Sequence, residues 1–290
     1  MIRTLGSILL AATALSSWAQ EPPRIYAQEL VDQAIAEHPD VVVLAMHVTP
    51  PKSSQNVIIA SNIGRIGKAA DDDDLRVVHT GKPNLAVNKA GDRFEAELVL
   101  QDASRRPIGA LGVVFAYKAG DDKATLQKKA EGVRDELRRR ISHVANLMET
   151  CPFDPSIPTH TFARHLVDQA LNANPDIVIV AIHVSTPTNK EYPIIASNIG
   201  RIGKKADADD MDVIKTAKPK LEINDSGDRF ESEGVLRDSA GDVLGAVGVV
   251  FPYKKGDDKQ ALHKRADELR EAWAKQIPSV AKLLEAFPRT

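Results

Sequence analysis

Hydrophobic and polar residues follow two different periods along the first half of the chain. Helical spacing of the apolar residues predicts a helix over 25–37, which Pro39 ends, and a long helix over 122–148. A short helix is expected over 73–80. Alternating or continuous apolar runs between these helices predict strands. The expected strands are 41–48, 57–63, 85–88, 93–100 and 108–117. This order of elements is typical of an α+β domain with an antiparallel sheet.

The same pattern occurs a second time. The octapeptide SNIGRIGK stands at 61–68 and again at 197–204, and the same offset of 136 residues aligns the GDRFE, GVVF and GDDK segments of the two halves. A repeat of about 125 residues is far longer than a solenoid repeat of about 20–50 residues. We therefore expect two domains, 20–149 and 159–290. The linker between them, 150–158, contains three prolines, which favour a stiff, non-helical chain.

Residues 1–19 have the pattern of a secretory signal peptide. Arg3 precedes an apolar stretch over 5–15, and Ser17 and Ala19 are the small residues that a cleavage site requires. We expect cleavage near Ala19 and a periplasmic or secreted mature protein. No later segment reaches the roughly 18 uninterrupted apolar residues of a membrane helix, so membrane insertion is not expected. Cys151 is the only cysteine, which excludes a disulfide within the chain.

Composition excludes several classes of protein. Of the 290 residues, 43% are hydrophobic and 27% charged, as in an ordinary globular protein. A net charge of −2 gives no general attraction for nucleic acid, and aromatic residues, at 4%, offer few stacking platforms. The chain has neither a G-x-S-x-G motif nor a cysteine with a neighbouring base, so no catalytic residue is assigned. No cofactor is expected either.

Metal binding has little support in the linear sequence. No second histidine or cysteine stands at ligand spacing from His47 or His183. The aspartates at 71–74 lack the alternating spacing and the distal glutamate of a calcium loop. The sequence therefore assigns no metal site.

Several motifs resemble the extracytoplasmic Cache branch of the PAS-type sensor domains. They are the glycine loop at 64–67 after the second strand, HTGK at 79–82, FEAEL at 94–98 and IGALG at 108–112. The resemblance implies two tandem PAS/Cache-like domains, each a five-stranded antiparallel sheet of order 2-1-5-4-3 with flanking N- and C-terminal helices. It also implies a small-molecule pocket between the sheet and the short helix. Family members usually sit between transmembrane helices of receptors, which are not expected here, so ligand binding is the implied function.

Strand 93–100 carries the clearest candidate site. Its alternation places Glu95 and Glu97 on the face opposite Phe94, and we expect apolar neighbours there at 111, 113 and 115 on the next strand. Buried carboxylates must form ion pairs or hydrogen bonds, or must contact a ligand. The alternative is a solvated face with a weak ion pair to Arg93.

Charged residues elsewhere leave the charge of the ligand open. The loop with Arg65 and Lys68 is suited to an anion, and its alternative is pairing with the aspartates at 71–74. His47 and Tyr117, which end strands, are expected at a pocket wall or in the core. With their counterparts, the candidate ligand-binding residues are His47, Arg65, Lys68, Arg93, Glu95, Glu97, Tyr117, His183, Arg201, Lys204, Arg229, Glu231, Glu233, Gly234 and Tyr253.

The two halves differ on the apolar face of this strand. Ala96 and Leu98 correspond to Ser232 and Gly234, and no neighbouring strand shows a compensating enlargement. We therefore expect the larger pocket in the second domain, bordered by Gly234, Ser232 and Tyr253.

The sequence thus predicts an exported, soluble, sensor-type protein with two domains that each bind a small polar molecule. A membrane receptor or a second copy of the chain is a possible further partner. The alternative is a structural or partner-binding periplasmic protein that uses its long amphipathic helices, and a hydrolytic enzyme is a distant third.

Overall fold

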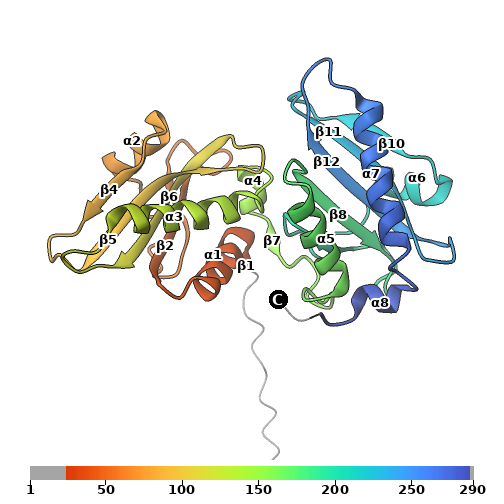
Figure 1. Cartoon of the computed structure of the whole chain (residues 1–290), viewed down its shortest axis with the longest axis horizontal. Helices are drawn as coiled ribbons and strands as arrows, with labels where there is room; N and C mark the ends of the chain where they lie inside the picture. The colour runs from red at the N-terminus through yellow and green to blue at the C-terminus, as the bar shows by residue number, and fades with distance from the viewer. Residues whose placement is uncertain (1–23, 288–290) are drawn as a thin grey trace, which may run out of the picture.

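The structure, a computed structural model, describes residues 24–287, which form two domains side by side (Figure 1). The signal peptide expected over 1–19 lies outside the described residues. The first sheet has the order β3-β2-β6-β5-β4 and the second the order β9-β8-β12-β11-β10, and all neighbouring strands are antiparallel. Counted within each domain, this is the order 2-1-5-4-3. The predicted α+β class with two five-stranded antiparallel sheets is therefore confirmed.

The elements of the two domains follow one another in the same order. The first domain contains α1 (Tyr26–Glu37), β2 (Val41–Val48), β3 (Val57–Ser61), α2 (Asp72–Thr80), β4 (Asn84–Val87), β5 (Arg93–Gln101), β6 (Pro107–Ala116), α3 (Lys123–Arg138) and α4 (Val144–Leu147). The second contains α5 (Phe162–Ala173), β8 (Ile179–Val184), β9 (Ile194–Ser197), α6 (Ala208–Thr216), β10 (Lys220–Ile223), β11 (Arg229–Arg237), β12 (Val243–Pro252), α7 (Lys259–Ala274) and α8 (Val280–Leu284). A short pair, β1 (Arg24–Ile25) with β7 (Thr150–Cys151), precedes the connection between them.

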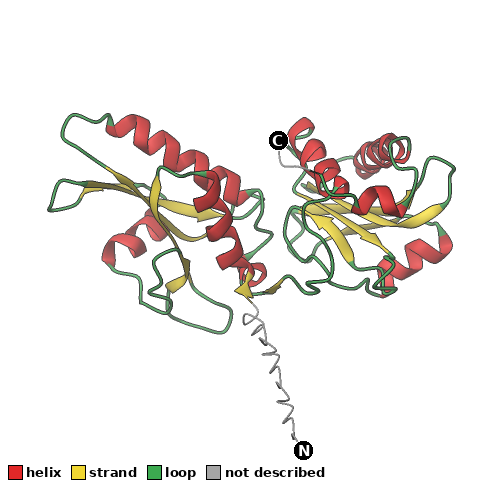
Figure 2. Cartoon of the chain, turned by 90° about the horizontal axis from the view of Figure 1, so that it is seen from below, coloured by secondary structure: helices red, strands yellow, loops and turns green. Residues whose placement is uncertain are grey.

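Helices cover both faces of each sheet (Figure 2). In the first domain α1 and α3 pack on one face, where Phe94, Leu98 and Leu100 of β5 are buried in the main core. The apolar stripe of α3 is part of that core, so it is covered by its own sheet. The short helix α2 lies on the opposite face, where Val77 contacts Val99. That second face carries Glu95 and Glu97.

The expected continuous helix over 122–148 is wrong, because the chain turns after α3. The amide of Ala103 donates a hydrogen bond to the carbonyl oxygen of Ile141 (2.7 Å), and Ile141 is fully buried. This tertiary contact holds the chain in a turn, and the separate helix α4 begins only at Val144. The second domain breaks in the same place, between α7 and α8, where Ser239 bonds to Ile277 (2.8 Å).

None of the helices within residues 24–287 is long and apolar enough to cross a bilayer.

Candidate functional site

The N-terminus of α2 holds two carboxylates in fixed positions. Asp71 caps the helix, and its Oδ1 accepts hydrogen bonds from the amides of Asp73 and Asp74. In return, Oδ2 of Asp74 accepts a hydrogen bond from the amide of Asp71 (3.0 Å). This capping box follows from the run of aspartates, because a carboxylate at the cap and another three residues later satisfy the free amides of the first turn.

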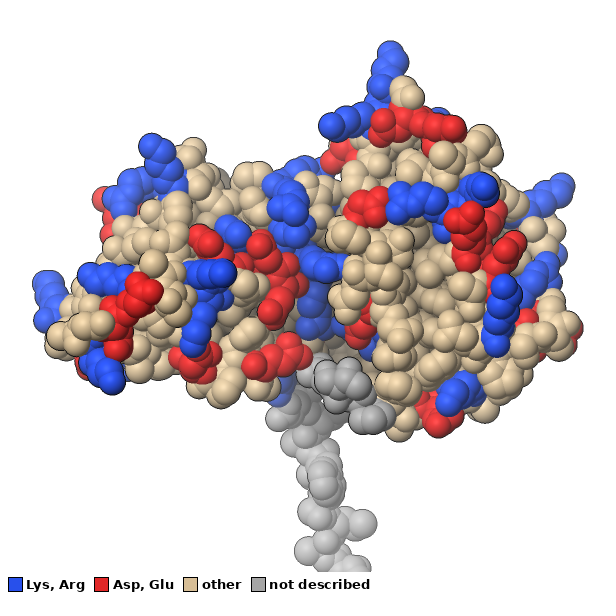
Figure 3. Space-filling view, viewed as in Figure 1, with Lys and Arg blue, Asp and Glu red and all other residues tan. Residues whose placement is uncertain are grey.

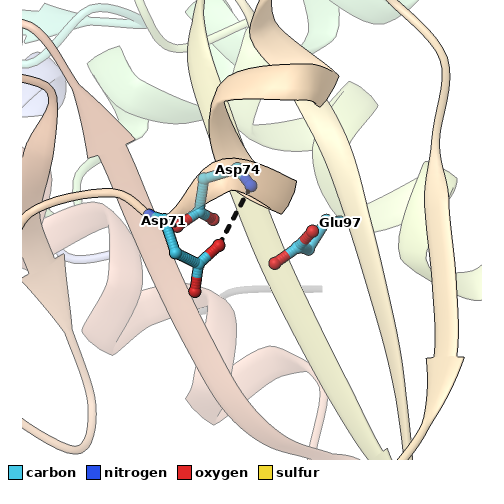
Figure 4. A group of neighbouring side chains, drawn as sticks. All are labelled: Asp71, Asp74 and Glu97. Carbon is cyan, nitrogen blue, oxygen red and sulfur yellow. Dashed lines mark hydrogen bonds between the residues drawn. The ribbon is translucent and has the colours of Figure 1, made fainter.

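Glu97 of β5 faces this helix end from the sheet (Figure 4). One ligand atom from each of Asp71, Asp74 and Glu97 lies within 4.8 Å of the others, and Asp74 and Glu97 are buried. The amide of Asn84 on β4 donates to Oε2 of Glu97 (2.9 Å). Burial, together with the charges of Asp74 and Glu95, raises the pKa of Glu97 to about 7 despite that hydrogen bond. The carboxyls therefore crowd one another, and within residues 24–287 no lysine or arginine forms an ion pair with any of the three.

The residues on β6 that lie beside the two glutamates are not the ones expected from the sequence. Glu95 lies opposite Val114 and Glu97 opposite Gly112, because Phe94 pairs with Phe115. The expected positions 111, 113 and 115 thus belong to the other face. Glu97 therefore has a glycine on one side and Asn84, its hydrogen-bond donor, on the other. The pKa of Glu95 is raised as well, by desolvation against the sheet and by Asp74 and Asp71.

His47 of β2 lies beside Asp74, next to but outside the group of three carboxylates. Its Nδ1 lies 3.3 Å from Oδ2 of Asp74, but the orientation makes no hydrogen bond and Nδ1 has no other partner. Burial lowers the pKa of His47 even though Asp74 and Asp71 act to raise it. The imidazole is therefore neutral near pH 7 and offers one unprotonated ring nitrogen.

The second domain has the same side chains at the equivalent positions. Asp207 and Asp210 form the capping box of α6, and Glu233 of β11 faces them. The pKa of Glu233 is raised by burial and by a hydrogen-bond contact with Asp210. His183 uses Nδ1 to bond the carbonyl oxygen of Tyr192 (2.9 Å), and its Nε2 lies 3.7 Å from Asp210. The two domains therefore have the same four acidic and histidine side chains at this site, but the histidine makes different contacts in each.

One position near the glutamate differs between the two sites. Asn84, the partner of Glu97, corresponds to Lys220 in the second domain. Lys220 forms ion pairs with Asp209 and with Glu222 at the edge of the site. The second site therefore has a lysine of its own close by, whereas the first has an uncharged amide.

Two of the expected cationic ligand contacts lie between the domains. Arg201 pairs with Glu149 of the first domain (2.8 Å). Arg229 is buried, donates to Oγ of Ser104 (2.7 Å) and lies 3.3 Å from Asp102, both in the first domain. These arginines join the two domains.

Their counterparts in the first domain, Arg65 and Arg93, are exposed. Lys68 and its counterpart Lys204 are exposed as well.

Tyr117 lies on the face of the first sheet that α3 covers, and Tyr253 lies on the face of the second sheet that α7 covers. Tyr117 packs beside Phe94, with ring centroids 6.4 Å apart, and Tyr253 packs in the same way beside Phe230 (6.3 Å). Both rings have a lysine of the following helix over them. They anchor α3 and α7 and do not face the acidic cluster.

The space expected at Gly234 is filled by Arg270 of α7. A Cβ added to Gly234 would lie 2.7 Å from Cζ of Arg270, whose guanidinium is buried. Arg270 donates to the carbonyl oxygens of Ser232 (3.1 Å) and Val247 (3.3 Å) and pairs with Asp267. The prediction of a pocket at Gly234 and Ser232 is therefore wrong, because a helix residue fills a gap that the comparison of strands left open.

Two hollows open elsewhere. One of about 430 Å³ lies in the second domain and is lined by residues that include Glu222, Glu231 and Val250, not by Gly234, Ser232 or Tyr253. The other, of about 1090 Å³, lies between the domains, and its lining includes Arg139, Arg140 and Arg164. Basic side chains are visible in the seam between the domains in Figure 3.

No family model and no curated protein matches this chain. Among solved structures, the inducer-binding domain of the PobR transcription factor from Acinetobacter is similar at 10% identity and a TM-score of 0.28, over 39% of this chain and 95% of that one. PelD from Pseudomonas aeruginosa is similar at 13% identity and 0.28, over 88% and 79%. The periplasmic domain of RsbU from Chlamydia trachomatis is similar at 6% and 0.26, over 84% and 80%. Likenesses this weak assign neither a family nor a ligand.

Proposed function

We propose that this chain is an exported, sensor-type binding protein whose two domains each bind a small positively charged ligand between the sheet and the short helix. One observation carries the proposal. Each domain brings two capping aspartates, a buried glutamate and a histidine to the same place, without a cation among the three carboxyls of the first site. The pattern of a signal peptide and the resemblance to Cache domains support export and ligand binding.

The charge of the ligand follows from the cost of burying carboxylates. Ionised carboxyls away from water are unfavourable unless a cation or hydrogen-bond donors compensate them. Asn84 provides one donor to Glu97, and the helix N-terminus provides amides to Asp71 and Asp74. A positively charged ligand would supply the rest. Arg65 and Lys68, which favoured an anion, lie on the exposed loop. Their charges act to lower the pKa of Glu95, but neither forms an ion pair with Asp71, Asp74 or Glu97.

Thermal-shift measurements on the mature protein test this proposal. The panel contains amines, diamines, quaternary ammonium compounds and divalent cations, with carboxylates and phosphate as the anionic controls. A ligand at one hundred times its Kd adds about 2.7 kcal/mol of stability. The variants Glu97→Gln and Glu233→Gln should each remove one of two binding events. The proposal is wrong if no cation shifts the melting temperature. It is also wrong if a cation shifts the melting temperature of the double variant, Glu97→Gln with Glu233→Gln, as much as that of the parent chain.

A further inference from the structure

The acidic site of the first domain has the donor set of a metal centre. Each carboxylate uses one oxygen in the hydrogen bonds described above and retains the other, namely Oδ2 of Asp71, Oδ1 of Asp74 and Oε1 of Glu97. A separation of at most 4.8 Å between one ligand atom of each residue allows a single ion to reach all three.

His47 is an independent feature that points to the same place. The residue is only 7% exposed, and its Nδ1 has no hydrogen-bond partner although it lies 3.3 Å from Asp74. A buried ring nitrogen that faces carboxylates without a hydrogen bond loses solvation and gains nothing in return. Coordination to a cation would satisfy it.

We infer that Asp71, Asp74, Glu97 and His47 bind one divalent transition-metal ion, an inference that rests on the proposed function and names its ligand in the first domain. One imidazole with three carboxylates suits Zn²⁺ or Mn²⁺ better than Ca²⁺, which takes six to eight oxygen ligands. The second domain is not expected to bind this ion with equal affinity. There, Nδ1 of His183 is bonded to Tyr192, and Lys220 stands in place of Asn84.

Isothermal titration calorimetry with Zn²⁺ and Mn²⁺ on the chelator-treated full chain tests this inference. We expect one ion per chain. Glu97→Gln and His47→Gln should weaken binding at least tenfold, whereas the matched change in the second domain, Glu233→Gln, should leave it unchanged. Circular dichroism checks that each variant is folded. If amines shift the melting temperature in a Glu97-dependent way and metals do not bind, the metal inference fails and the proposed function stands. If neither binds, both fail.

A second inference concerns an apolar patch that is exposed in one domain and buried in the other. Val42, Ile63 and Ile66 of the first domain are 39%, 45% and 58% exposed. The residues 136 positions later are 3–7% exposed, and they are Val178, Ile199 and Ile202. The sequence of the loop, SNIGRIGK, is the same in both places. The difference in burial therefore comes from what packs on the loop.

In the second domain the loop after β9 docks on the first domain. The side-chain amide of Asn146 donates to the carbonyl oxygen of Ile199 (3.1 Å), and that of Asn198 donates to the carbonyl oxygen of Arg139 (2.7 Å). The ring of Tyr26 lies where a Cβ of Gly200 would be, 2.6 Å from Cε2. The ion pairs Arg201–Glu149 and Arg229–Asp102 flank this contact.

We propose that the exposed loop of the first domain binds the C-terminal end of the second domain of another copy of this chain, in the same head-to-tail manner. Acidic residues stand at the matching positions, because Glu285 and Asp238 correspond to Glu149 and Asp102, opposite Arg65 and Arg93. Glu285 pairs with Lys282 within its own domain (2.8 Å), so Arg65 must share it. Phe162 takes the position of Tyr26, and the space at Gly64 is open, with nothing within 4 Å.

One pair in this contact is unfavourable. The ion pair between Arg106 and Asp228 (3.3 Å) corresponds to Asp242 opposite Asp92, two like charges. We therefore expect weaker association than the contact within the chain, and one that depends on protein concentration. Because the two surfaces are different, the contact is heterologous and produces either closed rings or open chains.

Sedimentation velocity over a concentration series tests the self-association. The mean mass should rise with concentration, and Ile66→Asp should abolish the rise. The matched control is Leu85→Asp, which places the same charge on an exposed residue of β4 outside the patch. Arg65→Glu should weaken association, and Glu285→Arg added to it should restore association. A monomer at every concentration overturns the inference, as does an equal effect of Ile66→Asp and Leu85→Asp.

Discussion

Gly234 and Arg270 show how a single residue difference is absorbed by a distant side chain. In the first domain, Leu98 fills the core under α3, and Arg134, the counterpart of Arg270, is half-buried with Asp135 as its partner. In the second domain, the missing side chain leaves room for the guanidinium of Arg270 against β11. The glycine thus accommodates a buried charge rather than a ligand.

This arrangement predicts that Gly234→Leu destabilises the second domain. The leucine must displace the guanidinium of Arg270, and overpacking of this kind costs about 1–3 kcal/mol. Denaturation by urea, followed by circular dichroism, measures the loss. Arg270→Ala in the same chain should recover part of it, because the two side chains no longer compete. An unchanged midpoint in the single variant would show that Arg270 moves away without cost.

Cys151 gives a second prediction at this scale. Burial raises the pKa of its thiol to about 11. At pH 8 only about one thiol in a thousand is then ionised, against roughly one in four for an unperturbed cysteine, and the thiolate is the reactive form. Ellman's reagent should therefore react on the order of one hundred times more slowly with the folded chain than with the chain in urea. Equal rates would contradict this burial.

At the scale of elements, the loop after β9 and the end of α4 are held together by an ion pair. Partial burial acts to raise the pKa of Glu149, but hydrogen bonds from Arg201 and Asn146 outweigh it and lower the pKa below its ordinary value of 4.5. A carboxyl with a lowered pKa stabilises the folded chain above its unfolded pKa, and this contribution is lost as the pH falls through the folded value.

We therefore expect Glu149→Gln to lower the free energy of unfolding at pH 7 by about 1–3 kcal/mol, because a charged hydrogen bond is removed from a half-buried site. The difference from the parent should shrink as the pH falls below about 4.5. Glu285→Gln at low protein concentration is the matched control, since Glu285 is the exposed counterpart of Glu149 in the second domain. A difference that persists at acidic pH would exclude the ion pair as the cause.

The strands and their order could be predicted from the sequence, because alternation along β5 and β6 is a local signal. The break after α3 could not, because Ile141 continues the helical spacing and the turn there is held by contacts such as the tertiary hydrogen bond from Ala103 to Ile141. The acidic site was found in part. The sequence identifies Glu97 and His47 as candidates but treats Asp71 and Asp74 only as partners of Arg65 and Lys68, since their contact with β5 depends on the tertiary fold.

At the scale of the whole molecule, the connection between the domains is a packed interface rather than a bare tether. Asn146, Glu149, Arg139 and Tyr26 of the first domain all contact the loop 197–204. Arg229, buried in the full chain, extends the contact along β11. The second domain therefore depends on the first for the burial of its apolar loop, whereas the loop of the first domain is exposed in the full chain.

This inequality predicts different behaviour of the two domains when they are produced separately as 20–149 and 159–290. The second domain alone should expose Val178, Ile199 and Ile202 and leave Arg229 without Asp102, so its melting temperature should fall below that of the full chain and it should aggregate. The first domain alone loses the contact of Tyr26 with Gly200, the pairing of β1 with β7 and several polar partners, but it uncovers no apolar loop of this size and should remain monomeric at low concentration. Differential scanning calorimetry with light scattering compares the three chains.

Replacing Ile202 by Ser in the isolated second domain should reduce its aggregation, because the exposed apolar area is the cause. Equal stability of the two isolated domains would mean that the interface buries the loop without stabilising it, and head-to-tail association through the same surface would then have no driving force.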